Sequence, residues 1–328
     1  MYTDIVTFGE AMTMFIADEI GELHRVEKFT RALAGAETNV AIGLSRLGYK
    51  VGWVSKVGDD PFGQYIIEAL KSEGVDTGCI SIESSYPTGF QLKSKVLVGD
   101  PKVKYFRKGS AASTLSKKDI DNTYFMAARH LHATGIPPAL SSSAREFSEE
   151  VIKRMKTAGK TVSFDPNLRP NLWNSENEMV EVINRFAVQA DWVLPGISEG
   201  KLLTGYSKAE DIAKFYLDQG VKLVVIKLGP MGAYFRTENE ETFVPGFHVE
   251  KVIDTVGAGD GFAVGVISGL LDGLNIEDAV IRGNAIGALA VMSPGDSDGL
   301  PTRRILEQFI YSKESRVLPS TKKRVSEC

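Results

Sequence analysis

The sequence predicts an α/β fold in which a mostly parallel central sheet has helices on both faces and a small β-sheet lies apart from it. From about residue 110 onward, strand patterns alternate with helical patterns, which favours parallel strands joined by helices. Within 86–108, residues 88–97 and 103–107 instead alternate with the two-residue period of half-exposed strands, so we assign this segment, together with the extended segment 12–33, to the small sheet. The third observation is a glycine-rich turn, 254–259, that leads from a predicted strand into an apolar helix.

The first part of the chain is predicted to supply strands to both sheets. Residues 4–9 have the pattern of a buried strand, and the polar stretch 18–27 indicates a hairpin inside the first small-sheet segment. Apolar residues recur at helical spacing over 40–47 and a glycine follows them, which predicts the first helix. A strand at 51–57 and a helix that ends at residue 73 come next.

The remaining residues are predicted to alternate between strands and helices before a tail. Strands are expected near 129–134, 161–165, 191–194, 222–227, 233–235 and 249–253. Helices are expected near 142–157, 176–187, 209–218, 260–271, 277–292 and 302–310. Residues 311–328 are polar and lack a periodic pattern, so we expect a loosely held tail after one domain that covers 1–310.

Composition and charge narrow the class of protein. The 328 residues are 43% hydrophobic and 24% charged, as in ordinary soluble globular proteins. The 38 basic and 42 acidic side chains give a formal charge of −4 without an evident basic face, so we do not expect nucleic acid as a partner. No secretory leader pattern and no run of about 18 apolar residues occurs, so we expect no membrane partner and a cytoplasmic location. Cys79 and Cys328 give neither a disulfide framework nor a metal-binding spacing.

The glycine turn and the helix after it carry the strongest chemical signal. Gly257, Ala258 and Gly259 remove side-chain bulk where the backbone bends, and a helix N-terminus offers amide groups to an anion. Asp260 follows directly, although its carboxylate would repel that anion; its ordinary role would be to complement the helix dipole. Both features are explained if the site transfers a phosphoryl group, with the amides holding phosphate charge and Asp260 accepting a hydroxyl proton.

The motif Asp254-Thr-Val-Gly-Ala-Gly-Asp260 resembles the C-terminal signature of the ribokinase-like (pfkB) carbohydrate kinases. The resemblance extends from Asp4 to about Ile310 and implies a ribokinase-like fold whose small sheet is a lid over the sugar. It also implies transfer from ATP, with Mg²⁺, to a sugar hydroxyl, with Asp260 as general base and Gly257–Gly259 as anion hole. A requirement for a monovalent cation stays open. No Walker sequence occurs, so a P-loop NTPase is not supported.

A second motif, Ala34-Gly-Ala-Glu-Thr-Asn39, resembles the N-terminal sugar-binding signature of the family, although Ala34 replaces a usual glycine. The resemblance implies that Gly35, Ala36 and Asn39 contact the sugar. Gly35 would let the backbone approach it, and the Asn39 amide would bond to its hydroxyl groups. The alternative is an ordinary capped helix N-terminus.

Two arginines and two aromatic residues are predicted to surround the sugar. Tyr105 and Arg107 share a strand face, and Phe90 is placed on another strand of the small sheet, so these residues could form an aromatic wall with a cation. The alternative is a solvated strand with a surface arginine. Arg169 follows the predicted strand at 161–165 and offers two donors to a phosphate or carboxylate. Two arginines near one site indicate that the sugar carries an anion, since an unpaired buried charge is costly.

Together these residues resemble the 2-keto-3-deoxygluconate kinases of the family. The resemblance implies that the sugar-acid carboxylate meets Arg169 most directly, and it adds Ile136 and Asp296 to the substrate-binding residues. The expected product is the 6-phosphate. Fructokinase or another pfkB sugar kinase is the neighbouring alternative. A sugar- or nucleotide-binding regulator without activity is the alternative of a different class, but it would not need Asp260.

Further motifs are assigned to the metal and the nucleotide. Asp165 and Asn167 at a strand end can order Mg²⁺-bound water, and Glu199 matches the acidic member of a family motif in which Gly196 replaces asparagine. The segment Lys227-Leu-Gly-Pro-Met-Gly232 resembles the nucleotide loop. That resemblance assigns the residues Lys227, Gly229 and Gly232 to the nucleotide; the alternative is a hairpin turn.

Two expectations concern the surroundings of the site. Asn284 lies among small residues of a predicted helix and is assigned to the adenine side, whereas the alternative is an asparagine satisfied by the backbone. Exposed edges of the small sheet can pair with a second copy of the chain, so we expect a homo-oligomer.

Overall fold

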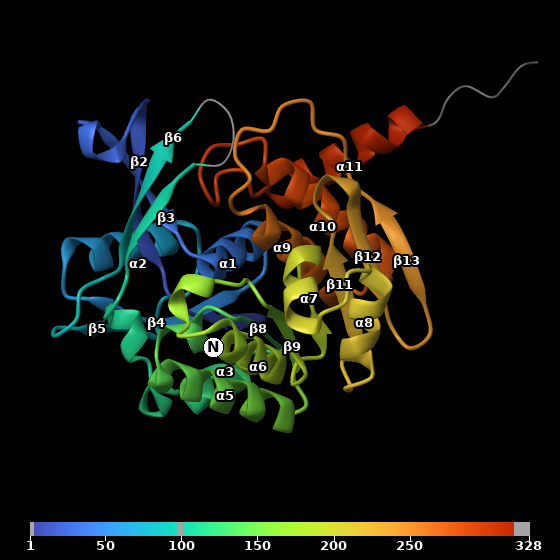
Figure 1. Cartoon of the computed structure of the whole chain (residues 1–328), viewed down its shortest axis with the longest axis horizontal. Coiled ribbons are helices and arrows are strands. Elements are labelled where there is room, and N and C mark those ends of the chain that lie inside the picture. The colour runs from blue at the N-terminus through green and yellow to red at the C-terminus, as the bar shows by residue number, and fades with distance from the viewer. Residues whose placement is uncertain (1–2, 97–100, 318–328) are drawn as a thin grey trace, which may run out of the picture.

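The computed structural model describes residues 3–96 and 101–317 (Figure 1). In this part of the chain, nine strands form the central sheet. Their spatial order is β13 (Glu241–Pro245), β12 (Gly232–Arg236), β11 (Leu223–Lys227), β10 (Trp192–Val193), β9 (Thr161–Asp165), β8 (His130–Thr134), β1 (Ile5–Phe8), β4 (Val51–Gly58) and β5 (Ile80–Glu83). Pairing is parallel from β11 to β5, and β12 and β13 extend the sheet as an antiparallel hairpin. The predicted mostly parallel sheet is confirmed.

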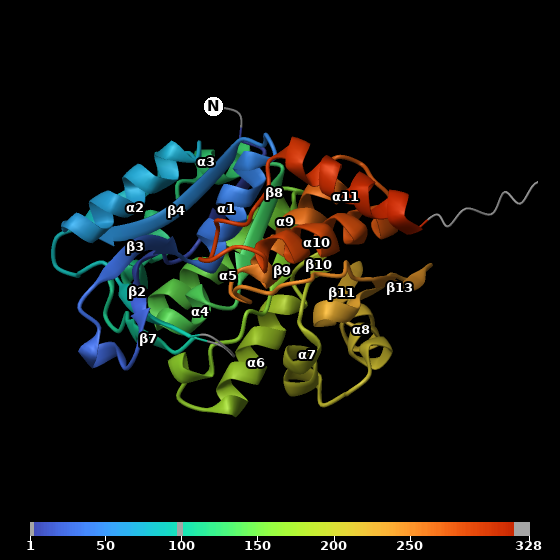
Figure 2. The same cartoon turned by 90° about the horizontal axis from the view of Figure 1, so that it is seen from above.

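Helices cover both faces of this sheet, as predicted. One core contains side chains of α1 (Ala36–Arg46), α2 (Pro61–Ser72), α9 (Ala258–Leu271), α10 (Ile276–Ala290) and α11 (Arg303–Val317). The opposite core contains side chains of α3 (Asn122–Ala127), α4 (Pro137–Leu140), α5 (Ser142–Thr157), α6 (Glu176–Ala187), α7 (Ile197–Thr204) and α8 (Ala209–Leu217). Figure 2 shows α9, α10 and α11 together on one side and α6 and α7 on the other. Neighbouring strand residues such as Ile5 and Val6 enter opposite cores because successive side chains alternate.

The small separate sheet consists of β3 (Phe29–Ala34), β2 (Met12–Ile20), β6 (Phe90–Lys95) and β7 (Val103–Phe106), in that order. It lies beside the main body at the level of α2 (Figure 1). One of its faces carries Phe15, Phe90 and Phe106, which form an aromatic cluster with Phe62 of α2. The other face is therefore available to the space between the two sheets.

Local signals explain where helices begin. The Asp60 carboxylate accepts hydrogen bonds from the amides of Phe62 (3.0 Å) and Gly63 (2.8 Å) at the start of α2. The Ser141 hydroxyl likewise caps α5. In contrast, α1 and α9 begin at Gly35 and Gly257 without a side-chain cap. Their first amide groups are thus left to other partners.

Several predicted elements differ from the structure. The strand expected at 249–253 is absent from the described residues: this segment is irregular, and the Ile253 amide donates to the carbonyl oxygen of Val291 (2.8 Å). Helix α11 continues to Val317, into the predicted tail, while 318–328 lie outside the described residues. Strand β13 was not predicted because charged and proline residues interrupt its apolar pattern. None of the helices within 3–96 and 101–317 is long and apolar enough to cross a bilayer.

Candidate active site

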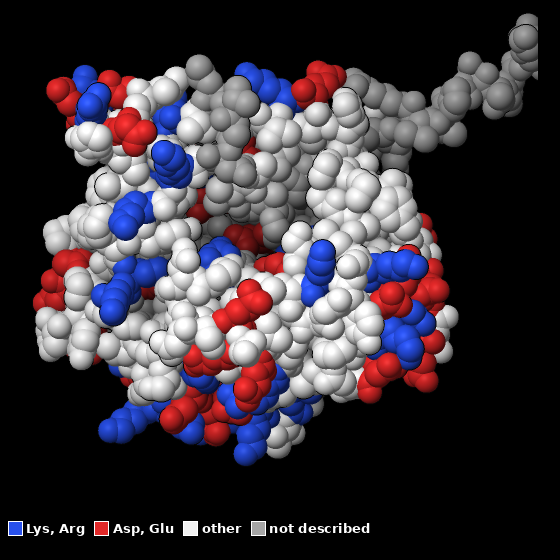
Figure 3. All heavy atoms as spheres, viewed as in Figure 1, with Lys and Arg blue, Asp and Glu red and all other residues white. Residues whose placement is uncertain are grey.

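A cavity of about 390 Å³ lies where the small sheet meets the carboxyl ends of the central strands. Figure 3 shows a hollow at this place with acidic side chains inside it. Such a strand end is where α/β proteins bind ligands. Most of the residues predicted from the sequence line it: Gly35, Ala36, Asn39, Tyr105, Arg107, Ile136, Asp165, Asn167, Arg169, Glu199, Lys227, Gly257, Gly259, Asp260 and Asp296.

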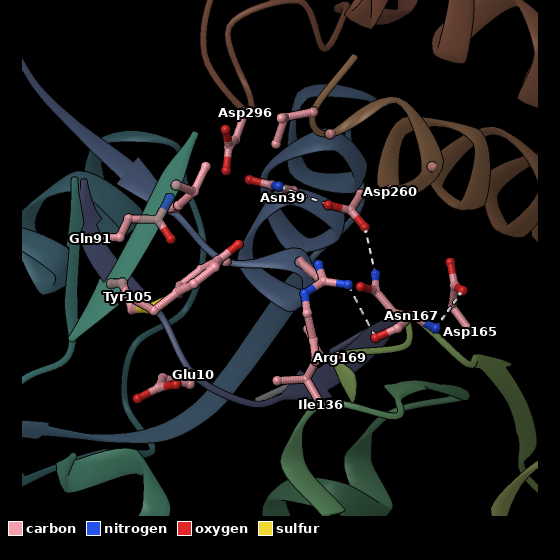
Figure 4. A pocket seen from close by; sticks show the side chains of 18 of the residues that line it. Glu10, Asn39, Gln91, Tyr105, Ile136, Asp165, Asn167, Arg169, Asp260 and Asp296 are labelled. Atoms are coloured by element: carbon pink, nitrogen blue, oxygen red, sulfur yellow. Dashed lines mark hydrogen bonds between the residues drawn. The ribbon is translucent and has the colours of Figure 1, made fainter. Parts of the chain in front are cut away.

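Asp260 is held between two asparagine side chains (Figure 4). Asn39 Nδ2 of α1 donates to Asp260 Oδ2 at 2.8 Å, and Asn167 Nδ2, just after β9, donates to Oδ1 at 3.1 Å. Burial raises the pKa of Asp260 to about 7, and the Asp165 carboxylate adds to the shift against the opposing hydrogen bond from Asn39. A carboxylate with this pKa is poised to accept a proton near neutral pH.

The start of α9 is shaped by close backbone packing. Gly257 has φ 81°, and a Cβ atom there would lie 2.1 Å from the carbonyl oxygen of Asp296, so only glycine fits. Asp254 Oδ1 accepts a hydrogen bond from the Val256 amide at 3.1 Å, which orients the turn before the helix. Gly257, Gly259 and Asp260 line the cavity, whereas Ala258 does not. The first turn of α9 therefore borders the cavity with two glycines and with Asp260.

Two carboxylates stand beside Asp260, and both have protein partners. Asp165 Oδ2 forms a salt bridge with Lys227 Nζ at 2.6 Å. Glu199 caps α7, where its two oxygens accept from the amides of Leu168 and Gly196, both at 2.8 Å. Carboxylates with remaining lone pairs fit the water ligands of a hydrated Mg²⁺ better than direct ligation. Across 3–96 and 101–317, no group of three or more His, Cys, Asp or Glu side chains could hold a metal by itself.

The two arginines of the cavity differ in their partners. Arg107 is buried and paired with Glu10: Nη2 and Nε lie 2.5 and 2.6 Å from Glu10 Oε2. Arg169 Nη1 instead donates to the carbonyl oxygens of Leu168 (2.9 Å) and Asn167 (3.3 Å). Both arginines line the cavity, but the charge of Arg107 is already compensated by Glu10, so contact between Arg107 and a substrate anion stays a prediction.

Phe90 does not line the cavity, contrary to the prediction. Its ring stacks on Phe106, with centroids 4.6 Å apart and an interplanar angle of 5°. Phe90 pairs with Phe106 across β6 and β7, and Gln91 pairs with Tyr105, so alternation puts Phe90 on the face opposite Tyr105. Tyr105 projects into the cavity from the small sheet, and Arg169 projects from the β9 side (Figure 4).

Three residues assigned to the nucleotide lie outside the lining of this cavity. Gly229 and Gly232 form the turn between β11 and β12, where a Cβ atom on Gly232 would lie 2.1 Å from the Val244 carbonyl oxygen. Asn284 Nδ2 donates to the carbonyl oxygens of Val244 (3.2 Å) and Pro245 (3.1 Å). The amide nitrogen of Asn284 thus binds the backbone of β13, as the alternative had it, and its place on the adenine side stays a prediction.

Sequence reasoning missed four polar residues that line the cavity: Glu10, Gln91, Lys93 and Thr255. Glu10 directly follows the first buried strand, and this charged residue at a strand end was a usable signal. Lys93 Nζ lies 2.5 Å from Asp254 Oδ2 and 3.3 Å from Asp296 Oδ1. Asp296, expected to contact the sugar, thus also contacts the small sheet.

Comparisons with known proteins agree over more than nine tenths of the chain. Residues 2–303 match the profile of the pfkB family carbohydrate kinases. The chain is 56% identical to 2-dehydro-3-deoxygluconokinase from Bacillus subtilis (strain 168) over 316 residues, which are 96% of this chain and 98% of the relative.

Two solved structures share the fold. The PfkB protein from Polaromonas sp. JS666 is 50% identical, with a TM-score of 0.86 over 93% of this chain and 99% of that chain. A putative ribokinase II from E. coli in complex with ATP and Mg²⁺ is 28% identical, with a TM-score of 0.87 over 94% and 99% of the two chains. The predicted ribokinase-like fold is confirmed. This chain belongs to the pfkB family of carbohydrate kinases.

Proposed function

We propose that the protein transfers the γ-phosphoryl group of ATP to the 6-hydroxyl group of 2-dehydro-3-deoxygluconate, which is another name for 2-keto-3-deoxygluconate. Arg169 carries the choice of substrate. Its guanidinium group lines the cavity and, within the described ranges 3–96 and 101–317, forms no salt bridge. A sugar-acid carboxylate would give this half-buried cation a charge-assisted pair. The name of the B. subtilis relative supports the same substrate.

Asp260 is the proposed general base. It accepts the proton of the sugar hydroxyl while the hydroxyl oxygen bonds to the γ-phosphorus and the bond from that phosphorus to the bridging oxygen of ADP breaks. The amides of Asn39 and Asn167 hold the carboxylate in one orientation during this step. Asp260 afterwards releases the proton to solvent.

The first turn of α9 is the proposed anion hole. The backbone amides of Gly257, Ala258 and Gly259 belong to a helix start without a side-chain cap, and the Ala258 amide donates only a long hydrogen bond to the Thr255 carbonyl oxygen (3.4 Å), so they can hold charge on the transferred phosphoryl group. The positive end of the helix dipole favours the same charge.

The nucleotide and its metal are proposed to occupy the adjoining end of the cavity. Mg²⁺ would neutralise oxygens of the β- and γ-phosphates. Asp165, Asn167 and Glu199 would hold its water ligands, since all three line this region. Lys227, at the end of β11, lines the cavity beside Asp165 and would contact the phosphates, and the turn with Gly229 and Gly232 would lie next to the nucleotide.

The small sheet, with its segments at 12–33 and 86–108, is the proposed lid of a single domain whose last helix, α11, ends at Val317. Gln91 and Tyr105 line the cavity from this sheet. Closure over the sugar would exclude water, which otherwise competes with the sugar hydroxyl for the phosphoryl group.

Fructokinase activity is the second candidate, and the Glu10–Arg107 pair favours it. Because Glu10 compensates Arg107, only Arg169 is left to require an anionic substrate. With a neutral ketose as substrate, one arginine rather than two would be left without a negatively charged partner.

The test is ATP-dependent turnover of 2-dehydro-3-deoxygluconate, 2-ketogluconate, fructose, ribose and tagatose 6-phosphate. We expect turnover confined to the keto acids. Arg169→Ala should raise KM for the sugar acid about 10- to 100-fold, the range for a hydrogen bond to a charged group, with a small change in kcat. Arg185→Ala, at an exposed position of α6, is the control. Turnover of fructose alone would leave phosphoryl transfer in place and overturn the proposed substrate.

We also propose a homo-oligomer, because β3 and β7 are the edge strands of the small sheet and Phe106 of β7 is 44% exposed. Light scattering after size-exclusion chromatography measures the assembly.

A cytoplasmic location is proposed because the reaction needs a supply of ATP. The requirement for a monovalent cation is tested by comparing turnover in potassium, sodium and tetramethylammonium chloride.

A further inference from the structure

Lys93 links the small sheet to the main body at the phosphate end of the cavity. It belongs to β6, two residues after Gln91, and its side chain is only 3% exposed. Its ammonium group lies 2.5 Å from Asp254 Oδ2 and 3.3 Å from Asp296 Oδ1. Both carboxylates are also buried, with side-chain exposures of 10% and 7%. A buried ammonium group between two buried carboxylates is a specific arrangement, because each unpaired charge would be costly.

The two carboxylates belong to the two segments that shape the anion hole. Asp254 opens the turn before α9, and its second oxygen accepts the hydrogen bond from the Val256 amide at 3.1 Å. Asp296 packs its carbonyl oxygen against Gly257, at the position where a Cβ atom would lie 2.1 Å away. The Lys93 ammonium group therefore contacts both Asp254, which precedes α9, and Asp296, which packs against Gly257.

The charge of Lys93 matters as well as its position. Asp254 and Asp296 would repel each other and any phosphate at the start of α9 if no cation lay between them. Lys93 comes from the small sheet, whereas both carboxylates come from the main body. The anion hole thus has its compensating charge only while β6 is in place.

From this geometry we infer that Lys93 is a positioning residue that makes phosphoryl transfer depend on the placement of the small sheet. It orients the 254–257 turn through Asp254 and supports Gly257 through Asp296, so the amides of α9 reach their working positions when the sheet covers the sugar. The inference rests on the proposed phosphoryl transfer. It gives a role to a residue that was assigned neither to the sugar nor to the nucleotide.

The test begins with Lys93→Met, which keeps an unbranched side chain of nearly the same length and removes its charge. We expect kcat to fall about 10- to 100-fold, the scale for a small misplacement of catalytic groups, while the Kd of ATP measured by calorimetry changes less than about 3-fold. Lys104→Met is the matched control, because Lys104 is exposed on the neighbouring strand β7. Thermal unfolding of each variant shows whether it is folded.

Two further measurements distinguish positioning from a merely structural role. Methylammonium chloride should restore turnover of Lys93→Ala in a saturable way, whereas sodium chloride at equal ionic strength should not. Lys93→Met should also cost much less in an Asp254→Asn background than in the wild type, because both substitutions break the same contact.

Each result of these measurements either supports or overturns the role of Lys93. A wild-type kcat in folded Lys93→Met, a change confined to KM for the sugar, or additive effects with Asp254→Asn would each overturn the inference. The assays use whichever panel sugar the wild type phosphorylates, so turnover of fructose would refute the proposed substrate and still test Lys93. A wild type that phosphorylates none of the sugars would overturn the proposed function and this inference with it.

Discussion

The two walls of the cavity are built in different ways. In the wall formed by the central sheet, functional groups are held by neighbours in the same wall, as Asn39 and Asn167 hold Asp260. The wall formed by the small sheet is joined to the opposite side through ion pairs, one at Lys93 and one between Arg107 and Glu10. The central wall is therefore held together internally, whereas the small-sheet wall depends on buried ion pairs for its attachment.

The largest expected effect comes from breaking a charge pair that joins the walls. Arg107→Met would leave Glu10, which is 1% exposed, without its cation, so the free energy of unfolding should fall by about 3–5 kcal/mol in urea titrations. The double variant with Glu10→Leu should recover much of this loss.

An exposed ion pair provides the matched control for that loss. Lys214 and Asp218 form an i,i+4 pair with side chains 59% exposed, so Lys214→Met should cost at most about 0.5 kcal/mol. Equal losses for Arg107→Met and Lys214→Met would refute the view that charge joins the two walls.

The next effect concerns chemistry in the central wall. Asp260→Asn should lower kcat at least about 10²-fold, because the amide cannot accept the hydroxyl proton, while the melting temperature and the Kd of ATP stay close to wild type. Asp211→Asn, at an exposed position of α8, should have no effect. Near-wild-type turnover of Asp260→Asn would remove Asp260 as the base.

A smaller effect is expected from pH. Burial raises the pKa of Asp260 to about 7, and a general base works only when deprotonated, so kcat/KM should fall up to tenfold per pH unit below about 7 and level off above it. Glu37 is a useful control, because burial also raises its pKa to about 7, yet it contacts Thr134 rather than Asp260. Glu37→Gln should keep the profile. If Glu37→Gln lost the pH dependence, the dependence would arise from Glu37 and not from Asp260.

The sequence predicts the wall formed by the central sheet better than the wall formed by the small sheet. Glycine turns and polar residues at strand ends are local signals, and they correctly brought Asp260, Asn39 and Asp165 to one cavity. The Glu10–Arg107 contact joins residues 97 positions apart, and no local pattern specifies such a pair. Ion pairs of this kind depend on how two sheets pack, which periodicity does not encode.

Register limited the prediction for the small sheet. Alternation correctly placed Tyr105 and Arg107 on one face, but it could not decide whether Phe90 pairs with residue 105 or 106, and a one-residue change reverses the face. The strand expected at 249–253 failed for a different reason. Val252 and Ile253 are apolar but half-exposed, and their segment forms no ladder.

The pairing of β2 with β6 has a consequence for the order of folding. These adjacent parallel strands come from segments that are separated in the chain by α1, β4, α2 and β5, which belong to the main body. Such non-local pairing carries a loop-closure cost until the intervening elements have packed. We therefore expect β2 to pair with β6 only after the intervening elements have packed, and a growing polypeptide completes the small sheet only after β6 and β7 have been synthesised.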